Sequence, residues 1–256
     1  MIELRQFSDS DSLATGAARR FLGALESRSP RPHPFTVALS GGRIATPFYD
    51  ALVAQTGGRR ALWENVEFFF TDERWVPLDH PDSNFQLARE RLFEPLEIPL
   101  VRCHALAGGP DREFAAAQAQ AELLARTPRS VQGQPILDLV ILGMGEDGHV
   151  ASLFPEASAE VVESRKVYLP VEGPKPPPER LTLTYAVLAE AREVWVLING
   201  SGKEAALQES LCENGRTPLA RVIRSRERTQ LFTAVPVETG GDGRSQFRSP
   251  EFGIRT

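Results

Sequence analysis

Two hydrophobic patterns alternate along the chain and predict its architecture. Short, nearly continuous apolar runs are typical of strands buried on both faces, and they lie at residues 35–39, 66–71, 136–142 and 193–199. Between these runs, apolar residues recur at helical spacing, most clearly over 11–28, 85–93, 111–126 and 203–212. This alternation of strands and helices predicts an α/β protein whose sheet is mostly parallel.

The stretch 136–155 carries the densest candidate chemistry. Its strand ends in glycines at 143, 145 and 148, and Glu146, Asp147 and His149 lie among them. The glycines satisfy a dinucleotide-binding pattern, but Pro155 leaves room for only about two helical turns, and no acidic residue ends the next strand. The favoured interpretation is a catalytic turn at the carboxyl edge of the sheet, with His149 as base and Asp147 as its partner.

A second glycine turn follows the strand at 35–39. Ser40, Gly41, Gly42 and Arg43 precede a helix for which Thr46 is the expected N-cap and Pro47 the expected first residue. A strand, a glycine turn and a helix N-terminus commonly bind an anion, although a tight connection alone could also require the glycines. Arg43 favours anion binding.

Two further strand ends carry charged residues. Residues 72–84 begin with Asp-Glu-Arg and include Asn84; they could form a solvated charge cluster, but Trp75 and Pro77 argue against a loose exposed loop. Residues 200–203 resemble part of a phosphate-binding loop, but Leu197 and Glu204 stand where its glycine and hydroxyl residue are required. Lys203 can still present its charge to a single phosphate.

Proline marks two segments that are expected to lack regular structure. These are the linker at 29–34 and the stretch 170–178, after which residues 180–184 alternate like a strand and Thr184 can cap a short helix. We expect one domain over 1–236, followed by a polar tail at 237–256 without fixed structure.

Composition narrows the classes of function. A net charge of −5 argues against a nucleic-acid or acidic-membrane surface, and the start of the chain lacks the pattern of a signal peptide. Cys103 and Cys212 have neither metal-site spacing nor a disulfide framework. A cytoplasmic protein acting on a small molecule is expected, as a monomer or a small homo-oligomer, with no metal.

Taken together and in order, the motifs resemble the 6-phosphogluconolactonase family. The matching pieces are Leu-Ser-Gly-Gly at 39–42, Asp-Glu-Arg at 72–74 with Asp-Ser-Asn at 82–84, Leu-Gly-Met-Gly at 142–145 with Asp-Gly-His at 147–149, Ala-Ser-Leu-Phe-Pro at 151–155, Arg-Leu-Thr-Leu-Thr at 180–184, and Gly-Lys at 202–203. The chain departs from the family pattern at Val150, where Thr is usual, and at Arg43-Ile44-Ala45, which replaces Ser-Thr-Pro.

The resemblance implies a modified Rossmann-type sheet flanked by helices, like that of ribose-phosphate isomerase and glucosamine-6-phosphate deaminase. It also implies hydrolysis of 6-phospho-D-glucono-1,5-lactone to 6-phosphogluconate in the pentose phosphate pathway, without a cofactor. The expected catalytic residues are His149, Asp147, Arg74 and Asp72. The expected substrate-binding and phosphate-binding residues are Ser40, Gly41, Gly42, Arg43, Asn84, Gly145, Arg180 and Lys203.

Two other functions fit parts of the pattern. A glucosamine-6-phosphate deaminase usually has Phe-Asn-Glu-Pro after the histidine and Tyr at the position of Asn84, whereas this chain has Ser-Leu-Phe-Pro at 152–155. A non-catalytic sugar-phosphate sensor is normally joined to a DNA-binding module, and the first 35 residues contain only one predicted helix and a proline linker. Both differences favour the lactonase.

Overall fold

The computed structural model describes residues 1–28, 33–107, 110–237 and 247–248. A seven-stranded sheet has the order β10-β1-β9-β8-β5-β2-β3, and every pair of neighbours in it is parallel. Its strands are β1 (Ile2–Gln6), β2 (Phe35–Leu39), β3 (Val66–Phe70), β5 (Leu139–Gly143), β8 (Glu193–Ile198), β9 (Thr229–Thr233) and β10 (Phe247–Arg248). The predicted α/β class with a mostly parallel sheet is confirmed.

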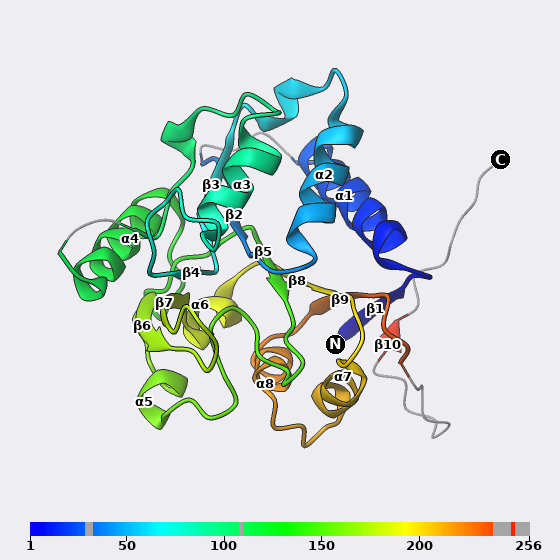
Figure 1. Cartoon of the computed structure of the whole chain (residues 1–256), viewed down its shortest axis with the longest axis vertical. Helices are drawn as coiled ribbons and strands as arrows, with labels where there is room; N and C mark the ends of the chain where they lie inside the picture. The colour runs from blue at the N-terminus through cyan, green and yellow to red at the C-terminus, as the bar shows by residue number, and fades with distance from the viewer. Residues whose placement is uncertain (29–32, 108–109, 238–246, 249–256) are drawn as a thin grey trace.

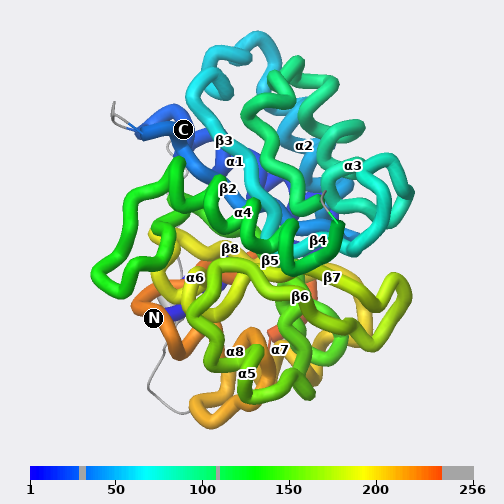
Figure 2. The backbone as a smooth tube through the Cα atoms, turned by 90° about the vertical axis from the view of Figure 1, so that its left-hand side faces the viewer, coloured from blue at the N-terminus to red at the C-terminus, as the bar shows by residue number. Residues whose placement is uncertain are grey.

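Helices lie on both faces of this sheet, as Figures 1 and 2 show from two directions. On one side lie α1 (Ser10–Glu26), α2 (Ala45–Thr56) and α3 (Asn84–Ala88), and on the other α7 (Glu204–Leu211) and α8 (Pro218–Arg224). The remaining α-helices are α4 (Arg112–Arg126), α5 (Ala159–Val162) and α6 (Tyr185–Glu190). Short 3-10 turns at Arg60–Trp63 and Leu100–Arg102 and a π-helical turn at Arg89–Phe93 complete the helical segments.

A second, three-stranded antiparallel sheet was not predicted. Its order is β4 (Asp72–Arg74), β7 (Glu179–Leu183) and β6 (Tyr168–Glu172). The expectation that 170–178 holds no regular structure is therefore wrong for Pro170 to Glu172. A proline is tolerated there because β6 is an edge strand, where a missing N–H need not disrupt the ladder.

The sequence predicted most helices to within a few residues, but the predicted starts of two helices need correction. Helix α2 begins at Ala45 with Ile44 as N-cap, so Thr46 and Pro47 lie inside its first turn and do not begin it. Thr184 does precede α6, but its hydroxyl donates to the Lys166 carbonyl (2.7 Å) and does not cap the helix. Of the tail predicted at 237–256, Phe247–Arg248 pairs with β1, and most of the rest lies outside the described residues, as do 29–32 of the linker.

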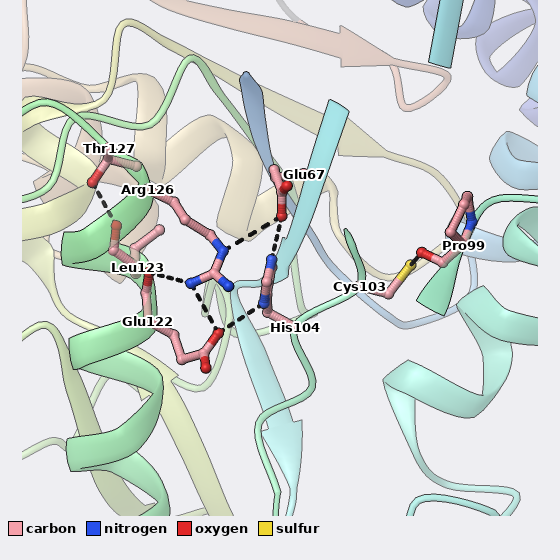
Figure 3. A network of polar contacts seen from close by, with 8 residues as sticks. All are labelled: Glu67, Pro99, Cys103, His104, Glu122, Leu123, Arg126 and Thr127. Atoms are coloured by element: carbon pink, nitrogen blue, oxygen red, sulfur yellow. Dashed lines mark hydrogen bonds and ion pairs between the residues drawn. The ribbon is translucent and has the colours of Figure 1, made fainter. Parts of the chain in front are cut away.

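A histidine without a predicted role joins β3 to α4 (Figure 3). His104 is nearly buried, its ring stacks on Phe69 with centroids 4.5 Å apart, and both of its nitrogens face carboxylates. Nε2 contacts Glu67 on β3, and Nδ1 lies 2.9 Å from Oε2 of Glu122 on α4. Arg126 lies 3.2 Å from the same Glu122 oxygen, which closes the network.

Replacing His104 should therefore destabilise the fold. His104→Ala removes a ring that bridges two elements and leaves the half-buried Glu67 without one of its partners, so the free energy of unfolding should fall by about 1–3 kcal/mol. Urea denaturation followed by circular dichroism measures this change. The exposed His33 supplies the control, since His33→Ala should stay within about 0.5 kcal/mol of wild type; equal effects of the two substitutions would contradict the bridging role.

Candidate active site

The candidate site forms where four neighbouring parallel strands end. In the order β8-β5-β2-β3 the strands are paired so that Leu39 lies opposite Phe70, and Gly143 opposite Leu197. The segments that leave these ends are 40–44, 71–74, 144–149 and 199–203. The four predicted clusters, distant in sequence, are therefore brought to one edge of the sheet, which is the ligand-binding edge of open α/β folds.

The turn after β2 is shaped by close packing. A Cβ atom at Gly41 would overlap Oδ1 of Asn84, and Gly42 has a φ of 85°. Tyr49 on α2 stabilises the turn, because its hydroxyl donates a hydrogen bond to the Ser40 carbonyl (2.8 Å). Helix α2 starts without a side-chain cap. The N–H of Ala45 donates to the Gly42 carbonyl and Pro47 has no N–H, so the N–H of Thr46 is the donor of the first turn that an anion could accept from.

The turn after β5 holds His149 against Asp147. Nδ1 of His149 lies 2.6 Å from Oδ1 of Asp147, and the backbone N–H of His149 donates to the same oxygen (3.1 Å). A Cβ atom at Gly145 would overlap the imidazole, so only glycine lets the ring lie this close to the turn. Gly148 has a φ of 78°, and a Cβ there would lie 2.6 Å from Cβ of Thr217 at the start of α8.

The hydrogen bonds also fix the charge of Asp147. Partial burial pushes the pKa of this carboxyl up, but the backbone N–H, the charge and the ring of His149 outweigh it, and the pKa lies below its ordinary value. With Nδ1 directed at the carboxylate, Nε2 is the ring nitrogen left to exchange a proton with a ligand. Nε2 has no hydrogen-bond partner within the described part of the chain.

Strand β4 supplies Asp72 and Arg74. Asp72 is buried, and its carboxylate accepts a hydrogen bond from the Ser152 hydroxyl (2.7 Å), while its backbone carbonyl accepts one from the Asn84 amide (2.9 Å). Nη1 of Arg74 donates to the Asp82 carbonyl (2.7 Å) in the loop that follows. The sequence predicted a charged cluster at the end of the strand at 66–71, and the structure adds that pairing with β7 holds both residues in a strand of their own.

Lys203 and Arg43 bring positive charge to the site. The pKa of Lys203 is lowered to about 8, mainly by burial and in part by the nearby Arg43, while Glu146 opposes the shift. Nη2 of Arg43 lies 2.9 Å from Oε1 of Glu146, in an ion pair that is largely exposed. Two cations thus share one carboxylate, which leaves a local excess of positive charge.

Arg180 reaches the site from β7. Nε donates to the Pro177 carbonyl (3.1 Å) and Nη2 to the Lys175 carbonyl (3.2 Å), so the guanidinium is held by the hairpin that precedes it. Its guanidinium carbon lies 5.7 Å from the centre of the Phe154 ring, and that ring lies 5.0 Å from the imidazole of His149. Phe154 therefore separates Arg180 from the histidine while contacting both.

These side chains surround a cavity of about 90 Å³. Its lining includes every predicted site residue except Asp147: Ser40, Gly41, Gly42, Arg43, Asp72, Arg74, Asn84, Gly145, His149, Arg180 and Lys203. Asp147 lines a larger neighbouring cavity of about 850 Å³, together with Ser152 and Phe154. The His149–Asp147 pair thus lies between the two cavities.

Several residues of the site had no role in the sequence interpretation. Glu146 pairs with Arg43, Ser152 with Asp72, and Phe154 packs on His149. Ser152 and Phe154 fall inside a quoted motif, so the motif marked the segment without showing what each side chain does. Within the described residues, no cluster of three histidine, cysteine, aspartate or glutamate side chains could hold a metal ion.

The fold and the site define an α/β protein with a histidine–aspartate pair and adjoining basic side chains at the carboxyl edge of its parallel sheet. Residues 8–232 match the model of the family described as glucosamine-6-phosphate isomerases/6-phosphogluconolactonase. The chain belongs to this family.

Individual relatives agree with the family match. A 6-phosphogluconolactonase of Mycobacterium tuberculosis is 35% identical over 210 residues, which is 80% of this chain and 84% of the relative. Another, from a Synechocystis species, is 39% identical over 179 residues, or 68% and 70% of the two chains. The solved 6-phosphogluconolactonase of Trypanosoma brucei superimposes with a TM-score of 0.77 at 28% identity, and the match covers 91% of this chain and 95% of the solved chain.

Among the helices that the structure describes, none combines the length and the apolar content that a membrane-spanning helix needs.

The lowered pKa of Lys203 makes a pH dependence of anion binding testable. Above a pH of about 8 the ammonium loses its proton, so the affinity for a phosphate monoester such as glycerol 3-phosphate should fall by on the order of tenfold between pH 7 and pH 9.5. The phosphate itself stays dianionic over this range, because its second pKa is about 6. Isothermal titration calorimetry measures the affinity. Lys203→Arg is the matched control, since a guanidinium keeps its charge and should flatten the profile; an equally steep profile in this variant would exclude Lys203 from the anion site.

Proposed function

We propose that this protein is an enzyme that hydrolyses 6-phospho-D-glucono-1,5-lactone to 6-phosphogluconate, in the cytoplasm and as part of the pentose phosphate pathway. The observation that carries the proposal is the position of His149, with Asp147 at its Nδ1, on the same cavity as Lys203 and Arg43. The same cavity therefore offers a base and positive charge. A lactone that carries a remote phosphate needs both.

In the proposed reaction, Nε2 of His149 takes a proton from water, and the water oxygen attacks the lactone carbonyl carbon. The carbonyl oxygen gains negative charge, which the guanidinium of Arg74 stabilises. When the tetrahedral intermediate collapses, the bond to the ring oxygen breaks, and His149 returns the proton to that oxygen. Asp147 stabilises the imidazolium between the two transfers.

We assign substrate binding to the remaining lining residues. Lys203, Arg43 and the N–H groups of the turn at 40–44 hold the phosphate, which fixes the lactone relative to His149. Arg180 and Asn84 contact the sugar part, and Gly145 leaves room for the catalytic ring. Asp72 acts through Ser152 and Asn84, because its oxygens already accept their hydrogen bonds. The proposal requires no metal or organic cofactor.

The competing activity within the family is deamination of glucosamine 6-phosphate. The segment that follows His149 contains no carboxylate as far as Pro155, so the turn lacks the additional acid that ring opening would use. We therefore expect purified protein to consume base in the presence of freshly generated 6-phosphogluconolactone, well above spontaneous hydrolysis. The same preparation should release no ammonia from glucosamine 6-phosphate. Ammonia release at a rate comparable to lactone hydrolysis would overturn the assignment.

The role of His149 can be separated from a structural one by comparing two histidines. General-base catalysis is typically worth about 10²–10⁴-fold, so His149→Ala should reduce kcat by a factor of that order. His104→Ala is the matched control: both of its ring nitrogens already face carboxylates, so kcat should stay within a few-fold of wild type.

Binding of 6-phosphogluconate, measured by calorimetry, shows whether the variants still form the site. His149→Ala should bind this product with nearly wild-type affinity, because the phosphate contacts remain. A His149→Ala enzyme within a few-fold of wild-type kcat would exclude the histidine as base. Loss of product binding together with loss of activity would assign it a structural role.

A further inference from the structure

Glu73 is a buried carboxylate that no step of the proposed reaction uses. It lies in β4 between Asp72 and Arg74 and is 1% exposed. Oε1 accepts hydrogen bonds from the backbone N–H groups of Arg74 (2.8 Å) and Asn84 (2.7 Å). Oε2 accepts them from the N–H of Phe85 (2.8 Å) and the hydroxyl of Ser83 (3.0 Å). Four donors therefore converge on one side chain.

Three of these donors belong to the beginning of α3. Ser83 is the N-cap of this helix and accepts from the N–H of Gln86 (3.1 Å), while the two preceding N–H groups, of Asn84 and Phe85, are satisfied by Glu73. A negative charge is favourable at a helix N-terminus. Glu73 thus caps a helix from a strand on the other side of the loop 75–82, and this closes the loop at both ends.

The groups fixed by this anchor line the cavity. Arg74 follows Glu73 directly, and its guanidinium is held by the Asp82 carbonyl within the closed loop. Asn84 donates to the Asp72 carbonyl and packs on Gly41, so its position also sets the shape of the turn at 40–44. A shift of the loop would move the proposed oxyanion donor and the wall of the anion site together.

The carboxylate is a poor stabilising device in itself. Burial raises the pKa of Glu73, and the four hydrogen bonds only oppose that shift. Desolvation therefore disfavours the charged form of Glu73, and buried charges often add nothing to stability relative to apolar replacements. The clearest effect of Glu73 in the structure is therefore geometric: its hydrogen bonds fix the backbone of Arg74 and Asn84.

We propose that Glu73 is a positioning residue for the lactonase reaction: it contacts no substrate and holds Arg74 and Asn84 in the geometry that the reaction requires. This inference rests on the proposed function.

A double-mutant cycle between Glu73 and Arg74 tests the positioning role. Glu73→Gln keeps the size of the side chain but places an amide NH₂ against two donors, so the loop should shift and kcat/KM should fall by on the order of 10–100-fold. In an Arg74→Ala background the same substitution should cost at least threefold less, because the part of the effect carried by Arg74 is already absent. An equal cost in both backgrounds would overturn the proposal.

Asp138 provides a matched control at the opposite end of the sheet. It is also a buried carboxylate, and it accepts hydrogen bonds from the N–H (2.9 Å) and hydroxyl (3.2 Å) of Thr36 just before β5 begins. Asp138→Asn should leave kcat/KM within about threefold of wild type and have the same effect with and without Arg74. A control that behaved like Glu73→Gln would show that the loss reflects general weakening of the fold.

Two further measurements keep the result decisive. If circular dichroism shows that Glu73→Gln does not fold, Ser83→Ala takes its place. This substitution removes one of the four donors and should show a smaller loss of kcat/KM with the same dependence on Arg74. An equal loss in both backgrounds would overturn the proposal.

If the wild type does not hydrolyse the lactone, that result rejects the proposed function and leaves the positioning role of Glu73 to be tested by binding. The cycle is then read from calorimetric affinity for 6-phosphogluconate, where coupling between Glu73 and Arg74 supports the positioning role and strict additivity refutes it.

Discussion

The parallel pairing of four neighbouring strands is the constraint on which the rest of the site depends. Parallel strands need crossover connections, so consecutive strand ends on one edge come from segments far apart in the sequence. In this chain, that edge collects two glycine turns, a charged strand and a lysine beside a helix N-terminus. None of these segments forms a site alone. The lysine, for example, has a lowered pKa because burial and Arg43, from another strand end, both act on it.

Two histidines of this chain differ in whether their surroundings leave a ring nitrogen available for proton transfer. His104 has carboxylates at both ring nitrogens, so its hydrogen-bonding capacity is consumed in joining β3 to α4. His149 has a carboxylate at Nδ1 only and lines a cavity with the rest of its ring. The glycine at 145 makes this possible, because any Cβ there would displace the imidazole. A histidine that transfers protons thus requires a hydrogen-bond partner at one ring nitrogen and open space at the other.

Sequence patterns predicted the parallel sheet and the residues that gather at its edge, because buried parallel strands read as apolar runs and glycine turns interrupt them abruptly. They did not predict the small antiparallel sheet, since β4 is three residues long and charged and β6 contains Pro170. The start of α2 was also misplaced, because good capping residues at 46 and 47 compete with a tight turn that begins the helix at Ala45. Local signals of this kind are overridden when tertiary packing fixes the turn.

The same limit explains why Glu73 escaped notice in an Asp-Glu-Arg motif. From sequence, a glutamate between two charged neighbours is most simply a solvated residue, and nothing in its spacing shows that three backbone N–H groups and a hydroxyl converge on it. Its significance follows from accounting for the orphan donors at the start of α3. Helices that approach an active site must have their first N–H groups satisfied by ligand, water or protein. In α3 the protein supplies the acceptor from the strand that carries Arg74, so one side chain both caps the helix and fixes the backbone next to Arg74.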